Sequence, residues 1–286
     1  MTVADEIAAS RIATARFEAP RRFERYVAIG DSSTEGLDDP DGNGGFRGWA
    51  NRLAERLATA QGSLLYANLG VRGKTTREIA TEQLPAAVAM RPDLATVFSG
   101  TNDVTARRFD AAAVAADIER MQASLVATGA TVLAFTLPDL TPVMPLARGL
   151  APRVRVLNAA IRAGCARTGA TLLDFAAYPV ASDARLWSDD RLHANAAGHA
   201  RMAAALAQAL GLPETDESWK LPLPAAAPCS AAQRLAAELR WYRRHLLPWL
   251  WQNRPGRSAG DSPGPKRPAL VPLTRGVTSG AAHAAL

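Results

Sequence analysis

Between residues 25 and 211 the sequence alternates short apolar or β-branched runs with longer amphipathic segments. Strand patterns that alternate with helix patterns are typical of βαβ units and a parallel sheet. Right-handed crossovers place the helices on both faces of such a sheet. We expect strands at residues 25–30, 64–69, 93–99, 130–136 and 170–175. The sequence therefore predicts a doubly wound, three-layer α/β/α domain with a five-stranded parallel sheet.

Polar residues and glycines follow the first three expected strands. Ser32 comes directly after the first strand, Gly70 after the second and Asn102 after the third. In open α/β sheets the ligand site lies beyond the carboxyl ends of the strands, so we expect these residues to meet there. A serine hydroxyl is a useful nucleophile only where a base takes its proton and hydrogen-bond donors receive the oxyanion.

A carboxylate and a histidine stand three residues apart just before the last expected helix, at Asp190 and His193. On a turn, an aspartate at this spacing can accept a hydrogen bond from imidazole Nδ1–H and leave Nε2 free to take a serine proton. The other histidines suit this role less well. We expect a structural role for His199, which lies in a helical pattern, whereas His245 and His283 lie in the tail.

Four short blocks, taken together, resemble the SGNH hydrolases, also called the GDSL esterase and lipase family. The blocks are Gly30-Asp31-Ser32-Ser33, a second centred on Gly70, Gly100-Thr101-Asn102-Asp103 and Asp190-Arg191-Leu192-His193. The resemblance covers residues 25–211 and implies a flavodoxin-like SGNH fold. It also implies a serine esterase that cleaves acyl or acetyl esters through an acyl-enzyme, with no cofactor and no metal.

The resemblance assigns a role to five residues. It makes Ser32 the nucleophile, His193 the general base and Asp190 the residue that orients His193. The oxyanion hole would consist of the backbone N–H groups of Ser32 and Gly70 and the side-chain amide of Asn102.

The first block departs from the family pattern, because Ser33 stands where an apolar residue is usual. Ser33 is thus an alternative nucleophile, although the Gly-Asp pair before Ser32 favours Ser32. Asp189 is likewise an alternative to Asp190, but the Asp-x-x-His spacing selects Asp190. A second hypothesis is a catalytically silent relative that binds an acylated carbohydrate or lipid. Wide separation of Ser32 Oγ from His193 Nε2 would favour that hypothesis.

The sequence divides into five segments. We expect an N-terminal helix or arm at 1–23, the hydrolase domain at 24–211, a Pro-rich connector at 212–229, an amphipathic helix at 230–252 and a disordered tail at 253–286. The net charge of +6 lies in the last part of the chain, since residues 225–286 carry nine basic and two acidic side chains. The first 224 residues therefore carry a net charge of −1, so the positive charge of the chain comes from its C-terminal part and not from the expected hydrolase domain.

The C-terminal helix has two interpretations. Its apolar residues at helical spacing favour docking onto the hydrolase domain. The alternative is a weak contact with a membrane surface, and with it a lipid substrate, through Trp241, Trp249, Trp251 and the arginines. We expect no nucleic-acid partner, because no recognisable module is present. Two distant cysteines give no zinc motif, and the first residues lack the apolar run of a secretory signal, so we expect a cytoplasmic protein.

Overall fold

The structure is a computed structural model that describes residues 21–225, 230–252 and 264–274. Its centre is a six-stranded sheet with the strand order β5-β4-β3-β1-β2-β6. The first five strands are parallel to one another, which confirms the predicted α/β class. The strands are β1 (Arg25–Gly30), β2 (Ser63–Asn68), β3 (Leu94–Phe98), β4 (Thr131–Phe135), β5 (Thr171–Leu173) and β6 (Arg267–Thr274).

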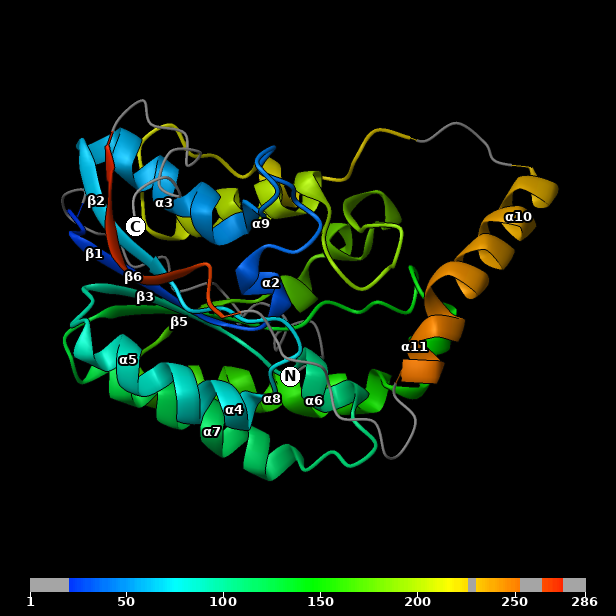
Figure 1. Ribbon diagram of the computed structural model, residues 1–286, viewed down its shortest axis with the longest axis horizontal. Coiled ribbons are helices and arrows are strands. Elements are labelled where there is room, and N and C mark those ends of the chain that lie inside the picture. Colours follow the sequence, from blue (N-terminus) through cyan, green and yellow to red (C-terminus); the bar gives the residue numbers. More distant parts are fainter. Residues whose placement is uncertain (1–20, 226–229, 253–263, 275–286) are drawn as a thin grey trace, which may run out of the picture.

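Helices cover both faces of this sheet (Figure 1). The helices α3 (Gly48–Gln61) and α9 (Ala196–Ala209) lie on one face, and α5 (Leu84–Ala89), α7 (Ala111–Val126) and α8 (Ala151–Thr168) lie on the other. Shorter helices follow the strands or extend other helices: α2 (Ser32–Glu35), α4 (Thr76–Glu78), a π-helical turn (Ile79–Gln83) and α6 (Thr101–Thr105). The 3₁₀ turns are Pro145–Gly149, Phe175–Ala177, Pro179–Ser182, Ala184–Leu186 and Ser218–Lys220.

Side-chain caps set where the long helices begin. Asp110 accepts hydrogen bonds from the N–H groups of Ala112 and Ala113 at the start of α7, and Asn195 caps α9 in the same way. The α8 helix ends at Gly169, whose φ of 79° is the left-handed conformation that glycine adopts most easily.

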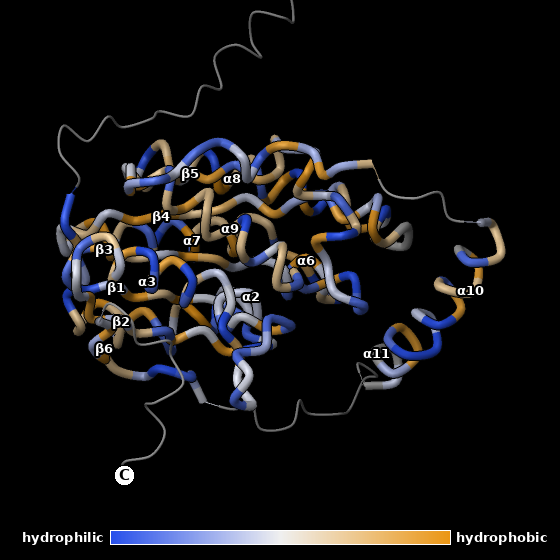
Figure 2. Tube along the Cα trace, turned by 90° about the horizontal axis from the view of Figure 1, so that it is seen from above, coloured by the Kyte–Doolittle hydropathy of each residue, from blue (hydrophilic) through white to orange (hydrophobic). Residues whose placement is uncertain are grey.

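The core lies between the sheet and the two helical layers. Figure 2 shows apolar residues concentrated along the strands and alternating with polar ones along the helices. In β1 the residues from Tyr26 to Gly30 are all buried, as expected for a strand covered on both faces. Tyr26 stacks on Tyr66, and its hydroxyl group hydrogen-bonds that of Thr96, so this buried polar pair of β1 and β3 is satisfied inside the sheet.

The expectation of a disordered tail over 253–286 is wrong for residues 267–274. They form β6, which pairs antiparallel with β2 at the edge of the sheet and buries Leu273. Pro268 and Pro272 obscured this strand in the sequence, but an edge strand tolerates proline where the missing N–H faces away from the neighbouring strand. Just before β6, Lys266 Nζ donates hydrogen bonds to the carbonyl oxygens of Phe46 and Arg47, at 2.8 and 3.0 Å.

The expected N-terminal helix or arm lies almost wholly outside the described residues, as do residues 226–229 of the connector and residues 253–263 and 275–286 of the tail. The segment 230–252 is described and contains α10 (Ala231–Trp241), a π-helical turn (Tyr242–Leu246) and α11 (Leu247–Gln252). Within the three described ranges, no helix has the length and apolar character needed to cross a membrane.

Candidate active site

The turn after β1 has a tightly constrained backbone. A Cβ atom at Gly30 would lie 2.1 Å from Thr34 Oγ1 and 2.5 Å from the carbonyl oxygen of Phe98, so no larger residue fits. Asp31 caps the short helix α2 by accepting a hydrogen bond from the N–H of Ser33. Ser32 is therefore the first residue of a helix that starts directly at the carboxyl end of the central strand.

A glutamine that the sequence analysis missed holds the same backbone. Gln83 Oε1 accepts a hydrogen bond from the Gly30 N–H at 2.8 Å, and Gln83 Nε2 donates one to the Gly30 carbonyl at 2.9 Å. The two bonds fix the peptide groups on either side of Gly30. A single glutamine in a helical pattern gives no sequence signal for such a long-range contact.

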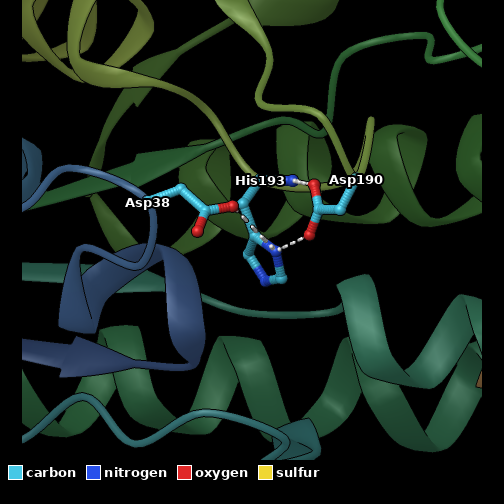
Figure 3. Close-up of side chains that lie close together, drawn as sticks. All are labelled: Asp38, Asp190 and His193. Carbon is cyan, nitrogen blue, oxygen red and sulfur yellow. Dashed lines mark hydrogen bonds and ion pairs between the residues drawn. The ribbon is translucent and has the colours of Figure 1, made fainter. Parts of the chain in front are cut away.

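The structure brings Ser32, His193 and Asp190 together in a chain of hydrogen bonds. Ser32 Oγ lies 2.8 Å from His193 Nε2, although 161 positions separate the two residues. His193 Nδ1 lies 2.6 Å from Asp190 Oδ2 (Figure 3). With a proton on Nδ1 shared with Asp190, Nε2 is the acceptor that can take the serine proton.

The turn between Ser188 and His193 fixes the Asp190 carboxylate. Asp190 Oδ1 accepts hydrogen bonds from Ser188 Oγ at 2.6 Å and from the N–H groups of Leu192 and His193 at 2.9 and 3.0 Å. The other oxygen, Oδ2, is left for the imidazole. The Asp-x-x-His spacing thus produces a carboxylate in which Oδ1 binds the turn and Oδ2 binds the imidazole.

Electrostatics favour a charged Asp190 and an imidazolium at His193. Burial alone would raise the pKa of Asp190, but the hydrogen bond and charge of His193 hold it well below its usual range. Burial would also lower the pKa of His193, but the hydrogen bond and charge of Asp190, with smaller contributions from Asp38 and Asp31, raise it. Burial raises the pKa of Asp31 itself to about 7.

A second carboxylate faces His193 from a loop of the first crossover. Asp38 Oδ2 lies 4.0 Å from His193 Nδ1 on the side away from Asp190 (Figure 3), and Asp38 has a left-handed backbone with φ of 66°. Potential ligand atoms of Asp38, Asp190 and His193 all lie within 4.8 Å of one another. A metal ion there would have to replace the proton between His193 and Asp190, so the arrangement fits a hydrogen-bonded pair better than a ligand set.

The Gly70 N–H, expected as an oxyanion donor, has a hydrogen-bond partner at the end of β2. It donates to Asn68 Oδ1 at 2.9 Å, and a Cβ atom at this position would lie 2.8 Å from the backbone nitrogen of Glu35. The glycine is therefore needed for packing of the β2 loop against α2, and its donor is already used.

Gly73, which the sequence analysis did not single out, lies three residues further along the same loop. It has a φ of 80° and open space where a Cβ would lie, and its N–H donates to no acceptor in the described part of the chain. Asn102 Nδ2 donates to the carbonyl oxygen of Lys74 at 2.9 Å, which places the Asn102 amide beside this loop.

The neighbouring polar residues have other partners. Ser33 Oγ accepts a hydrogen bond from Trp49 Nε1 at 3.3 Å. His199 is buried, accepts a hydrogen bond from the Trp49 N–H and lies 3.0 Å from the Leu37 carbonyl, and burial lowers its pKa to about 4. Asp103 braces the loop by accepting hydrogen bonds from Thr76.

An apolar pocket opens beside Ser32 and His193. Its walls come from the loop after β4, from α8 and from the turns before α9, and they include Leu140, Met144, Val154, Tyr178, Val180 and Trp187. Ser32 is itself among the residues that line this pocket. An apolar chain attached to a group at Ser32 could therefore be removed from water here.

The fold and the site define a serine hydrolase. A family model for the GDSL-like lipase/acylhydrolase family matches residues 28–201, and the chain belongs to this family, which includes the SGNH-type esterases. A sequence comparison with curated proteins finds no match.

Solved structures share the fold. The chain is similar to LAE5, an alpha/beta hydrolase from the metagenome of Lake Arreo, with 24% identity, a TM-score of 0.55 and coverage of 66% of this chain and 95% of that one. It is also similar to a catalytic mutant of Axe2, an acetylxylan esterase from Geobacillus stearothermophilus, with 17% identity, a TM-score of 0.57 and coverage of 68% and 97%. The lipase/acylhydrolase from Enterococcus faecalis gives 21% identity, a TM-score of 0.55 and coverage of 68% and 99%.

The Asp38→Asn substitution tests the electrostatics of His193. Removal of this negative charge destabilises the imidazolium, so we expect the pKa of His193 to fall. NMR titration of the imidazole signals measures that pKa directly. Asp189→Asn is the matched control, because it removes an exposed carboxylate from the residue beside Asp190. An unchanged pKa in Asp38→Asn, or an equal fall in Asp189→Asn, would contradict the assignment.

Proposed function

We propose that the protein is an esterase that hydrolyses acyl esters through an acyl-enzyme on Ser32. The observation that carries this proposal is the hydrogen-bonded chain from Ser32 Oγ to His193 Nε2 at 2.8 Å and from His193 Nδ1 to Asp190 Oδ2 at 2.6 Å. Family membership supports the same reaction class.

In the proposed mechanism Ser32 Oγ attacks the ester carbonyl carbon while His193 Nε2 takes the hydroxyl proton. Asp190 stabilises the imidazolium and keeps Nε2 directed at the serine. His193 then returns the proton to the leaving alcohol, and a water molecule releases the acyl group by the reverse sequence. The reaction needs neutral His193 at the start, so the raised pKa of this residue predicts that activity is lost as the pH falls through that value.

We place the oxyanion beside three donors: the Ser32 N–H, the Gly73 N–H and the Asn102 side-chain amide. Ser32 is the first residue of α2, so its N–H has no acceptor within that helix. Gly73 replaces Gly70 in this proposal because the Gly70 N–H is bound to Asn68. One such donor typically contributes roughly 10² to 10³ in rate.

The alternative of a catalytically silent binding protein is less well supported. It would be favoured by a wide separation of Ser32 from His193, and the two side chains are within hydrogen-bond distance instead. An acylated ligand would in either case place its chain in the apolar pocket.

The pocket favours an acyl chain longer than acetyl. Its lining is apolar over the loop after β4 and the facing turns. Each CH₂ group of an acyl chain that is buried there contributes about 0.8 kcal/mol to the free energy of binding. A small acetyl group would leave most of this lining uncovered.

Recruitment to a lipid surface is a second candidate function, and the exposed apolar residues of α10 and the following turn favour it. Leu235, Leu239 and Tyr242 have exposed fractions of 62%, 56% and 45%. Arg240 and Arg243 lie in the same helical segment, where they could attract anionic headgroups.

The Ser32→Ala substitution tests the proposed nucleophile. We expect it to abolish labelling by a fluorophosphonate and to lower kcat for p-nitrophenyl esters by a factor on the order of 10⁶. Ser33→Ala is the matched control and should keep both, because the Ser33 hydroxyl is bound to Trp49. Undiminished labelling of Ser32→Ala would overturn the assignment.

A series of p-nitrophenyl esters from acetate to octanoate tests the acyl pocket. We expect kcat/KM to rise by up to about fourfold per added CH₂ until the pocket is filled. Val154→Trp narrows the pocket and should move the preference to shorter chains, whereas Val156→Trp, on the exposed side of the same helix, should not. A preference of the unmodified protein for acetate would contradict a long-chain role.

Vesicle flotation tests the lipid-surface hypothesis. We expect the protein to float with vesicles that contain anionic phosphatidylglycerol and not with neutral phosphatidylcholine vesicles. Combined replacement of Leu235, Leu239 and Tyr242 by serine should abolish flotation. Equal flotation of both proteins, or of neither, would remove this candidate function.

A further inference from the structure

The C-terminal helix touches the turn that carries Asp190 and His193. Among the described side chains of residues 231–252, Trp241 is the buried one, with 7% of its surface exposed. Its indole Nε1–H donates a hydrogen bond of 3.0 Å to the backbone carbonyl of Asp190. Figure 1 shows α10 and α11 at one end of the molecule, away from the strands.

Arg191 forms the second part of this contact. Its guanidinium lies over the Trp241 ring, 4.8 Å from the ring centre, and donates two hydrogen bonds of 2.8 and 2.7 Å to the Glu238 carboxylate. Bidentate pairs and cation–π contacts both fix the direction of an arginine side chain. The residue after Asp190 is thus bound on two sides by the helix.

The backbone of this turn needs such support. Arg191 has a φ of 64°, a left-handed conformation that residues other than glycine rarely adopt. Strained residues of this kind persist only where surrounding contacts hold them. The Trp241 hydrogen bond holds the peptide group between Asp190 and Arg191, and the Glu238 pair holds the Arg191 side chain.

We propose that Trp241 is a positioning residue for the active site: through the Asp190 carbonyl and the Arg191 side chain it keeps the Asp190 carboxylate aligned with His193 Nδ1. This role rests on the proposed esterase function. Trp241 is not among the residues that line the acyl pocket, so it acts on the proton relay and not on substrate binding.

This role predicts which kinetic constants change. Loosening of the turn lowers kcat and leaves KM nearly unchanged. A weaker Asp190 contact also destabilises the imidazolium, so the acid limb of the pH profile moves to lower pH. The charged groups that face His193 are Asp190, Asp38 and Asp31, and variants at Trp241 leave all three in place.

The test compares three variants of the full chain. Trp241→Ala removes the hydrogen bond and the ring, whereas Trp241→Phe removes the N–H donor and keeps a ring beneath Arg191. Leu247→Ala, at an exposed leucine of α11, is the matched control. We expect kcat to fall about tenfold in Trp241→Ala and less in Trp241→Phe, with KM within about twofold and with no change in Leu247→Ala.

Two further measurements distinguish loss of the Trp241 contact from unfolding of the variant and from an absence of esterase activity. Urea unfolding shows whether a variant is folded, and Trp241→Phe decides the question if Trp241→Ala does not fold. NMR titration of His193 needs no turnover, so a lower pKa in the Trp241 variants supports the contact even if the protein shows no esterase activity. An unchanged kcat and His193 pKa in the folded Trp241 variants, or an equal change in Leu247→Ala, would overturn the proposal.

Discussion

The site depends on the close approach of the chain at the carboxyl end of β1. At Gly30 the neighbouring atoms of β3 and α2 leave no room for a side chain. Gln83 hydrogen-bonds to both the N–H and the carbonyl of Gly30. Ser32 is therefore presented from a rigid turn and not from a free loop. Because β1, β2 and β3 are parallel, the loops that carry Gly73 and Asn102 leave from the same edge of the sheet as Ser32, and the turn before α9 brings His193 to the serine.

The electrostatics of the site follow from burial and from the carboxylates that oppose it. A buried imidazole alone would stay neutral and would bind a proton only weakly. The Asp190 carboxylate reverses this preference, and its own orientation comes from Ser188, two backbone N–H groups and the contact of Trp241 with its carbonyl. The helix α10 follows a Pro-rich connector and is separate from the hydrolase domain in the sequence. Its Trp241 nevertheless hydrogen-bonds directly to the backbone of Asp190.

Much of the fold could be predicted from the sequence, because buried parallel strands are nearly continuous apolar runs and the helices between them are amphipathic. The edge strand β6 could not, since Pro268 and Pro272 interrupt its pattern and its partner β2 lies some 200 residues earlier. At the site, residue types, spacing and the family resemblance predicted roles for Ser32, Asp190, His193 and Asn102, and the structure brings the first three into one hydrogen-bonded chain. The sequence could not distinguish Gly70 from Gly73, because only the packing against α2 and the partner of each N–H separates them.

The central claim is that Ser32 attacks an ester carbonyl whose oxygen becomes an oxyanion beside the Gly73 and Asn102 loops. A crystal structure of the protein after reaction with an alkylphosphonate tests this directly, because the phosphorus adduct resembles the tetrahedral intermediate. We expect a covalent bond from Ser32 Oγ to phosphorus, the alkyl group in the apolar pocket and a phosphoryl oxygen within hydrogen-bond distance of the Gly73 N–H and Asn102 Nδ2. An adduct on Ser33, or a phosphoryl oxygen directed away from both donors, would contradict it.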